Sequence, residues 1–213
     1  MKPSAEKIEE FVRLAHKVAA MGLVRCSSGN LSWRVDDEHV LLSGTKTWLS
    51  ELTCGQVAIV RLSDGEPVND VTPSVESRFH LGILRNRPAK RCVLHFQSPA
   101  ATALACRPTP WADLNVILEM PYYVGPVSTV PFHLPGSGEL AEAVIRAAAD
   151  SDMVVLANHG QVTVGKTPHD AIQQAAFFEL ACEIVLRNGP NCRAIDPQHV
   201  RTLRSLSTDG GPA

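Results

Sequence analysis

Residues 91–105 read "RCVLHFQSPAATALA", and this stretch decides the fold class. The run 91–96 is apolar and short, as in a buried strand, and the alanine-rich run that follows predicts a short helix. The same alternation recurs along the chain and predicts a three-layer α/β domain. Further strands are predicted at 30–35, 39–44, 57–62, 153–158 and 161–165, and further helices at 4–22, 74–87, 138–150 and 168–188.

Two parts of the chain give a weaker signal. The stretch 107–135 is rich in proline and aromatic residues, and no element can be assigned to it. The stretch from about 190 to 213 is polar and is predicted to be a frayed tail. A length of 213 residues fits one domain, 1–213, that includes this tail.

Composition narrows the class of protein. The formal net charge is −2 and there is no basic stripe, which argues against a nucleic-acid partner. No apolar run approaches the ~20 residues of a membrane span, and the first residues do not resemble a signal peptide. Six cysteines without CxxC spacing are expected to be mostly free, buried thiols, which predicts a cytoplasmic protein.

The end of the strand 91–96 carries a pair of polar residues. His95 and Gln97 are two apart, so on a strand both side chains would point to one face. A His-x-His pair there would indicate a metal site at once. His-x-Gln leaves open whether the site is lost, altered or absent.

Other polar residues collect at the ends of predicted elements. The stretches 27–30 (SSGN) and 43–45 (SGT) combine hydroxyls with a glycine and can aim donors at an anion, although each alone is more often a simple turn. His159 follows a second central strand, as His95 does, and ligands of open α/β sheets bind at such strand ends. Each histidine alone is more often a core residue. With Glu76 at a predicted helix start, a metal-and-base site is about as well supported as core packing.

These segments together resemble the class II aldolase/adducin family. The resemblance runs from about residue 8 to 186 and is carried by six stretches in the family's order. They are SSGNLSWR (27–34), LLSGT (41–45), PSVESRFHLGILRNRP (73–88), VLHFQSPAATALA (93–105), GSGELAEAV (136–144) and VLANHGQVTVGK (155–166).

The resemblance implies a fold and a set of site residues. The fold would be a three-layer α/β/α sandwich around a central mixed, mostly antiparallel sheet. Glu76 would be the acid/base carboxylate, and His95 and His159 two of three zinc-binding histidines, with Gln97 at the third position. The phosphate-binding residues would be Ser27, Gly29, Asn30, Ser43, Gly44 and Ser74.

Two positions depart from the family pattern. Val75 stands where sugar-phosphate aldolases often have a second phosphate-binding serine, which weakens the case for phosphate. Gln97 offers an amide oxygen, a poorer zinc ligand than imidazole. The favoured interpretation keeps a metal on His95, His159 and Glu76, with Gln97 binding weakly or through water. The alternatives are a histidine from elsewhere, with His133 as the candidate, or a lost metal.

The implied function is a divalent-metal-dependent aldolase. It would cleave a ketose phosphate or a similar hydroxy-carbonyl compound through an enediolate, using Zn²⁺ or, less favoured, Mn²⁺, Fe²⁺ or Co²⁺. The family resemblance also implies a homotetramer. The alternatives are a sugar-phosphate 4-epimerase, a decarboxylase that forms the same enediolate, or a non-catalytic adducin-like domain.

Three further residues are candidates for a role in the site. His80 lies one turn after Glu76 and could hydrogen-bond that carboxylate, although packing is the favoured interpretation. Tyr122 and Tyr123 are the only tyrosines, and family aldolases commonly use a tyrosine to protonate the leaving aldehyde. Aromatic packing is the favoured interpretation for both.

Overall fold

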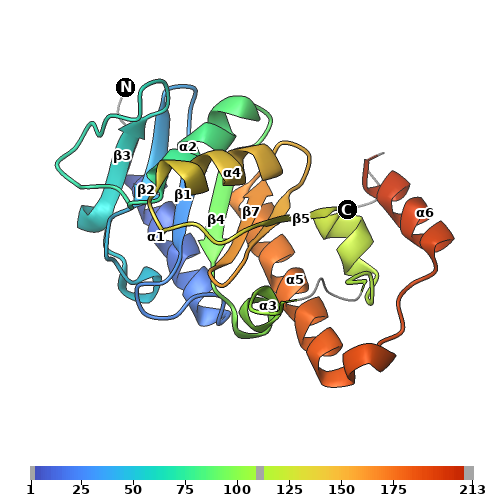
Figure 1. Ribbon diagram of the computed structural model, residues 1–213. Helices are drawn as coiled ribbons and strands as arrows, with labels where there is room; N and C mark the ends of the chain where they lie inside the picture. Colours follow the sequence, from blue (N-terminus) through green and yellow to red (C-terminus); the bar gives the residue numbers. More distant parts are fainter. Residues whose placement is uncertain (1–2, 109–112, 209–213) are drawn as a thin grey trace.

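The computed structural model describes residues 3–108 and 113–208, and its helices and strands alternate along most of the chain (Figure 1). The strands are β1 (Asn30–Arg34), β2 (His39–Ser43), β3 (Val57–Arg61), β4 (Cys92–Phe96), β5 (Val127–Val130), β6 (Met153–Leu156) and β7 (Gly160–Gly165). The α-helices are α1 (Ala5–Ala20), α2 (Ser77–Asn86), α3 (Pro99–Ala105), α4 (Gly138–Ala147), α5 (Pro168–Asn188) and α6 (Pro197–Thr208). Short helical turns are η1 (Leu49–Glu51), η2 (Cys54–Gln56), η3 (Met120–Val124) and η4 (Gly189–Asn191).

The strands form one seven-stranded sheet in the order β3-β2-β1-β4-β7-β6-β5. Every neighbouring pair is antiparallel except β5 and β6, which are parallel. The predicted mixed, mostly antiparallel sheet is therefore confirmed. The strand that carries His95 lies at its centre, with Asn30 of β1 opposite on one side and Val162 of β7 on the other.

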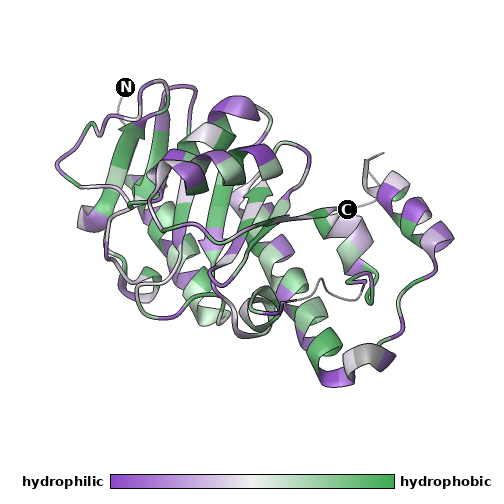
Figure 2. Ribbon diagram, in the orientation of Figure 1, coloured by the Kyte–Doolittle hydropathy of each residue, from purple (hydrophilic) through white to green (hydrophobic). Residues whose placement is uncertain are grey.

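Helices cover both faces of the sheet (Figure 1). Along β4 the side chains of Cys92, Leu94 and Phe96 enter an apolar core shared with α1, α3 and α5. Val93 points the other way, into a second core shared with α2 and α4. Because side chains alternate along a strand, His95 points to the face of Val93, under α2. The two cores confirm the predicted three layers, and apolar residues are seen in the sheet and in the helices that cover it (Figure 2).

The two segments that the sequence left open contain ordered elements. The stretch 107–135 holds η3, a single π-helical turn, and β5, which pairs with β6. The prediction of a frayed tail is wrong for residues 197–208, which form α6 and pack against η3. Residues 109–112 and 209–213 lie outside the described parts of the chain.

The cysteines are unpaired, but most of them are not buried. All six lie among the described residues; Cys92 and Cys182 are buried, whereas Cys26, Cys54 and Cys106 are exposed. The expectation of mostly buried thiols is therefore wrong. Separately, none of the helices in 3–108 and 113–208 has the length and apolarity that crossing a bilayer would require.

Candidate metal centre

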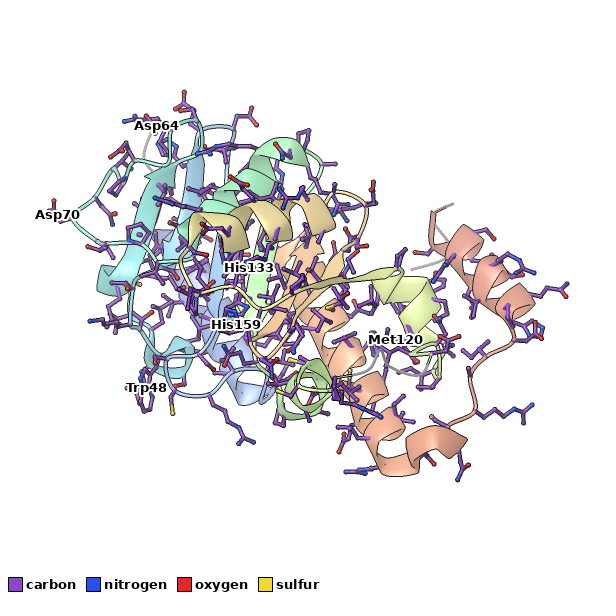
Figure 3. All side chains as sticks on the ribbon, viewed as in Figure 1. Trp48, Asp64, Asp70, Met120, His133 and His159 are labelled. Atoms are coloured by element: carbon purple, nitrogen blue, oxygen red, sulfur yellow. The ribbon has the colours of Figure 1, made fainter. Side chains whose placement is uncertain are left out.

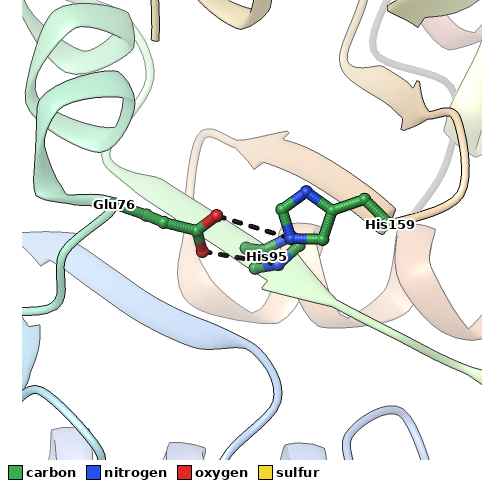
Figure 4. Close-up of side chains that lie close together, drawn as sticks. All are labelled: Glu76, His95 and His159. Atoms are coloured by element: carbon green, nitrogen blue, oxygen red, sulfur yellow. Dashed lines mark ion pairs between the residues drawn. The ribbon is translucent and has the colours of Figure 1, made fainter. Parts of the chain in front are cut away.

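One carboxylate and two imidazoles come together at one end of the central strands of the sheet (Figure 4). Glu76 is the residue that precedes α2, as predicted. His95 lies one residue before the end of β4, and His159 lies in the turn between β6 and β7. The antiparallel β6–β7 hairpin places His159 beside the end of β4, because β7 is the neighbour of β4.

Each oxygen of the Glu76 carboxylate faces a different imidazole. His95 Nε2 lies 3.4 Å from Oε2, and His159 Nε2 lies 3.5 Å from Oε1. The side chains of Glu76 and His95 are almost fully buried, and that of His159 is one-tenth exposed. The ligand atoms of the three residues all lie within 4.8 Å of one another.

The hydrogen bonds around this group leave electron pairs turned towards each other. His95 Nδ1 donates to the backbone oxygen of Gln161 at 2.9 Å, so the Nε2 of a neutral His95 ring carries a lone pair towards Glu76. Glu76 Oε1 is buried without a hydrogen-bond partner in the described parts of the chain. One proton can bridge only two of the three groups, whereas a divalent cation can accept electron pairs from all of them.

Burial also keeps the second imidazole neutral. Burial lowers the pKa of His159 to about 4, and the neighbouring His95 adds to this effect while Glu76 opposes it. A neutral imidazole is the form that binds metal. At pH 7 His159 therefore presents a ring ready to coordinate.

The spacing of the three groups also suits one ion. Two ligand atoms that each lie about 2.0–2.1 Å from a tetrahedral ion are roughly 3.4 Å apart. The His95–Glu76 and His159–Glu76 separations of 3.4 and 3.5 Å agree with this value. Both imidazole–carboxylate separations therefore fit ligation of one divalent metal.

Two glycines allow the backbone segments of the site to approach closely. A Cβ atom at Gly160 would lie 2.6 Å from the backbone oxygen of Phe96 and 3.1 Å from the His95 ring. Gly29 has a φ of 80°, and a Cβ there would lie 2.7 Å from the backbone oxygen of His95. Larger residues at either position would push the end of β4 away from its neighbours.

A cavity of about 360 Å³ opens over the three residues. Five of the six predicted phosphate-binding residues line it: Ser27, Gly29, Asn30, Gly44 and Ser74. Ser43 does not line it, and its Oγ instead accepts the backbone N–H of Leu31 within the sheet.

Asn30 has a bond that the sequence did not suggest. Its Nδ2 donates to Glu76 Oε2 at 2.8 Å. This amide therefore helps to hold the carboxylate.

One residue of the cavity was missed by the sequence analysis. Lys46 is the single Lys or Arg among the described residues that line the cavity, and it is exposed. Its φ of 59° is unusual for a residue with a Cβ, and such backbone positions concentrate at functional sites. The available signal was a cation directly after Ser-Gly-Thr at 43–45.

The remaining candidates divide between this cavity and other places. Gln97 lines the cavity, although it follows β4 and is not part of the strand. His133 is partly exposed and is outside the metal-capable group that the described residues form; it lies on the loop before α4 (Figure 3). Tyr122 and Tyr123 line a separate cavity, and the Tyr123 ring stacks on Phe177 of α5.

Comparison with known proteins agrees with this arrangement. Residues 9–186 match the family described as class II aldolase and adducin N-terminal domain. The chain belongs to this family. It is 32% identical over 202 residues to 3-oxo-tetronate 4-phosphate decarboxylase of Escherichia coli (strain K12), covering 92% of this chain and 94% of the relative.

Two further relatives extend the comparison. The 5-methylthioribulose-1-phosphate/5-deoxyribulose-1-phosphate aldolase of Rhodospirillum rubrum is 30% identical over 177 residues, which is 81% of this chain and 77% of that one. The crystal structure of Escherichia coli YgbL superposes with a TM-score of 0.88 at 28% identity, covering 93% of this chain and 98% of that one. The relatives are enzymes that act on sugar phosphates, and the fold is shared along nearly the whole chain.

Proposed function

We propose that this protein is a divalent-metal-dependent decarboxylase of a phosphorylated 3-oxo sugar acid. The observation that carries the proposal is the convergence of Glu76, His95 and His159, whose ligand atoms all lie within 4.8 Å of one another. The similarity to 3-oxo-tetronate 4-phosphate decarboxylase over 92% of the chain supports this substrate class. Aldol cleavage, the reaction that the family resemblance alone favoured, becomes the second candidate.

His95, His159 and Glu76 would hold the metal, with Gln97 at the cavity wall as a weak or water-mediated ligand. When bound, the ion supplies a Lewis acid that stabilises negative charge on the oxygens of an enediolate. Zinc is the favoured ion because two of the three strong ligands are imidazoles, with Mn²⁺, Fe²⁺ and Co²⁺ as alternatives.

Glu76 is the group suited to move a proton at the reacting carbon. In decarboxylation the C1–C2 bond breaks, CO₂ leaves, and the electron pair of that bond enters the C2–C3 enediolate. Glu76 would take up a proton from solvent and deliver it to C2, which gives a ketose phosphate one carbon shorter.

The loops of the cavity would bind the substrate's phosphate. The cavity is lined by two residues with hydroxyls, Ser27 and Ser74, and by two glycines, Gly29 and Gly44. Val75 is exposed and lacks the hydroxyl that a serine would offer to the phosphate. Lys46 would instead contribute a positive charge. Backbone and hydroxyl donors at such loops are well suited to an anion.

Aldol cleavage of a ketose phosphate is the second candidate. It forms the same enediolate, and the 30% identity to an aldolase supports it. It also requires a base that takes the proton of the cleaved hydroxyl, whereas CO₂ leaves without any proton transfer. Both tyrosines of this chain line another cavity of the same chain, and decarboxylation needs no tyrosine.

Three wider expectations go with the proposal. We propose that residues 1–213 act as one domain, that the protein is cytoplasmic, and that it assembles as a homotetramer. The first follows from length, the second from the cysteine content, and the third from the family resemblance.

The test is to supply the protein, loaded with Zn²⁺ or Mn²⁺, with 3-oxo-tetronate 4-phosphate and to measure released CO₂. A parallel assay with ketose 1-phosphates would measure released aldehyde. The proposal expects CO₂ release that a chelator abolishes, with one solvent deuterium in the product when the reaction runs in D₂O. Aldehyde release without CO₂ release would favour the second candidate, and neither product would contradict both.

A further inference from the structure

A line of three buried polar side chains leads from Glu76 into the protein, beginning with Asn30 at the cavity wall. Asn30 and Ser32 are two apart on β1, so they point to the same face of the sheet. His80 lies on α2, one turn after Glu76, and reaches between them. Ser32 and His80 are fully buried, and Asn30 is 7% exposed.

These side chains form a continuous chain of hydrogen bonds that ends on the carboxylate. Asn30 Nδ2 is 2.8 Å from Glu76 Oε2, and His80 Nε2 is 2.5 Å from Asn30 Oδ1. Ser32 Oγ is 2.7 Å from His80 Nδ1. His80 thus contacts Glu76 through Asn30 and not directly, as its spacing along the helix had suggested.

The chemistry of each group fixes the direction of every bond. A carboxylate only accepts, so the Asn30 amide must turn its NH₂ group to Glu76 and its carbonyl oxygen to His80. That oxygen only accepts, so His80 must carry its proton on Nε2. The unprotonated Nδ1 then accepts the hydroxyl proton of Ser32. All three donors point towards Glu76.

We propose that His80 is a positioning residue that fixes the orientation of the Asn30 amide and, through it, the Glu76 carboxylate at the proposed metal centre. The two ends of an amide have nearly the same shape, so packing alone does not select one orientation. With the amide reversed, two oxygens would face each other at the Asn30–Glu76 contact. When the Ser32 hydroxyl donates to Nδ1, the proton of His80 is on Nε2 and needs an acceptor, which excludes this arrangement.

The surroundings of His80 favour the neutral ring that this role requires. Burial lowers the pKa of His80 to about 3, and the nearby His95 adds to the effect. The ring also stacks on Phe79, with ring centroids 4.7 Å apart. Ser32, Asn30, Phe79 and His95 are thus the groups that face it, and none of them carries a negative charge.

The first test compares metal binding by three variants, using Zn²⁺ titrated into metal-free protein. His80→Leu removes the donor, whereas His80→Gln keeps an N–H close to the position of Nε2. His39→Leu is the control, because His39 is also a buried histidine. It lies at the start of β2 and contacts Asp36 in the turn before that strand. Circular dichroism checks that each variant is folded.

We expect His80→Leu to weaken Zn²⁺ binding by about 10- to 100-fold, the usual effect of losing a partner behind a ligand. His80→Gln and His39→Leu should bind nearly as the parent does. Parent-like affinity in folded His80→Leu would overturn the proposal. Equal weakening in folded His80→Gln would overturn it too, because the retained N–H would then have no effect.

The second test does not depend on the proposed function, on which the metal assay rests. Nitrogen-15 NMR of the metal-free protein at pH 7 reports which ring nitrogen of His80 carries the proton. We expect protonation at Nε2 alone, and a ring protonated at Nδ1 or at both nitrogens would overturn the proposal. If the parent took up no metal, the proposed function would fail while this measurement still decided the role of His80.

Discussion

The metal cavity and the cavity lined by Tyr122 and Tyr123 differ in how their charged and polar groups are paired. The cavity lined by Tyr122 and Tyr123 is the larger, at about 410 Å³ against about 360 Å³. Its lining includes an ion-paired group, in which Asp152 lies within ion-pair distance of Lys90 and of the nearby Arg87. At the metal cavity, the Glu76 carboxylate instead faces Nε2 of His95 and Nε2 of His159. The comparison teaches that the convergence of metal-capable ligand atoms, and not volume, distinguishes the proposed site.

The largest expected effect is on Glu76. Glu76→Gln keeps the shape of the side chain but removes its ability to carry a proton, so turnover should fall by about 10²–10⁴-fold. Steady-state kinetics with 3-oxo-tetronate 4-phosphate, the proposed substrate, measures this. Asp152→Asn is the matched control at the other cavity and should leave turnover nearly unchanged. Equal effects of the two substitutions would break the distinction between the cavities.

The convergence of Glu76, His95 and His159 could be predicted from the sequence because its signals are local. Glu76 at a helix start and His95 at a strand end are readable from a few neighbouring residues, and the hairpin around His159 brings the third group beside them. The links between Ser32, His80 and Asn30 were out of reach, because they join residues about 50 positions apart.

The other cavity could not be predicted for a related reason. The stretch 107–135 shows no periodic spacing of apolar residues, and the tail is polar. Neither pattern therefore predicts η3, β5 or α6. Both are held by tertiary contacts: β5 pairs with β6, and α6 packs against η3. Tertiary contact overrides weak local preference in both places.

The next expected effect is on the pH dependence of stability. Burial holds the pKa of His80 near 3 in the folded protein, against about 6.5 for an unperturbed histidine. Between these values the unfolded chain binds a proton that the folded protein does not, so stability is complete above pH 6.5 and declines as pH falls towards 3. This group alone contributes up to about 1.4 kcal/mol per pH unit.

Denaturant unfolding of metal-free protein across pH 4–7 measures that slope. His80→Gln removes the titrating ring, so its free energy of unfolding should fall less steeply with acid than that of the parent. His159 titrates in both proteins and cancels from the difference. Parallel slopes would show that His80 is not the buried neutral ring described above.

A smaller effect is expected from restoring the family's ligand at position 97. Gln97→His replaces a weak amide ligand with imidazole, so Zn²⁺ affinity should rise by on the order of tenfold. Calorimetric titration of the metal-free parent and variant gives both dissociation constants. Unchanged affinity would mean that the side chain at position 97 does not reach the ion.

The smallest effect is expected from the tyrosines. Tyr122→Phe and Tyr123→Phe remove hydroxyls at the other cavity, and decarboxylation needs no tyrosine, so turnover should change by less than about twofold. Kinetics of both variants decides the matter. A loss comparable to that of Glu76→Gln would connect the two cavities functionally and return aldol cleavage to first place.

The central claim is that Glu76, His95 and His159 hold a divalent metal, and elemental analysis tests it most directly. The protein should be purified without a chelator beside His95→Ala, with His39→Ala as a control for histidine loss elsewhere. We predict about one zinc or manganese ion per chain in the parent and in His39→Ala, and almost none in His95→Ala. A parent without metal, even after incubation with zinc or manganese, would contradict the account.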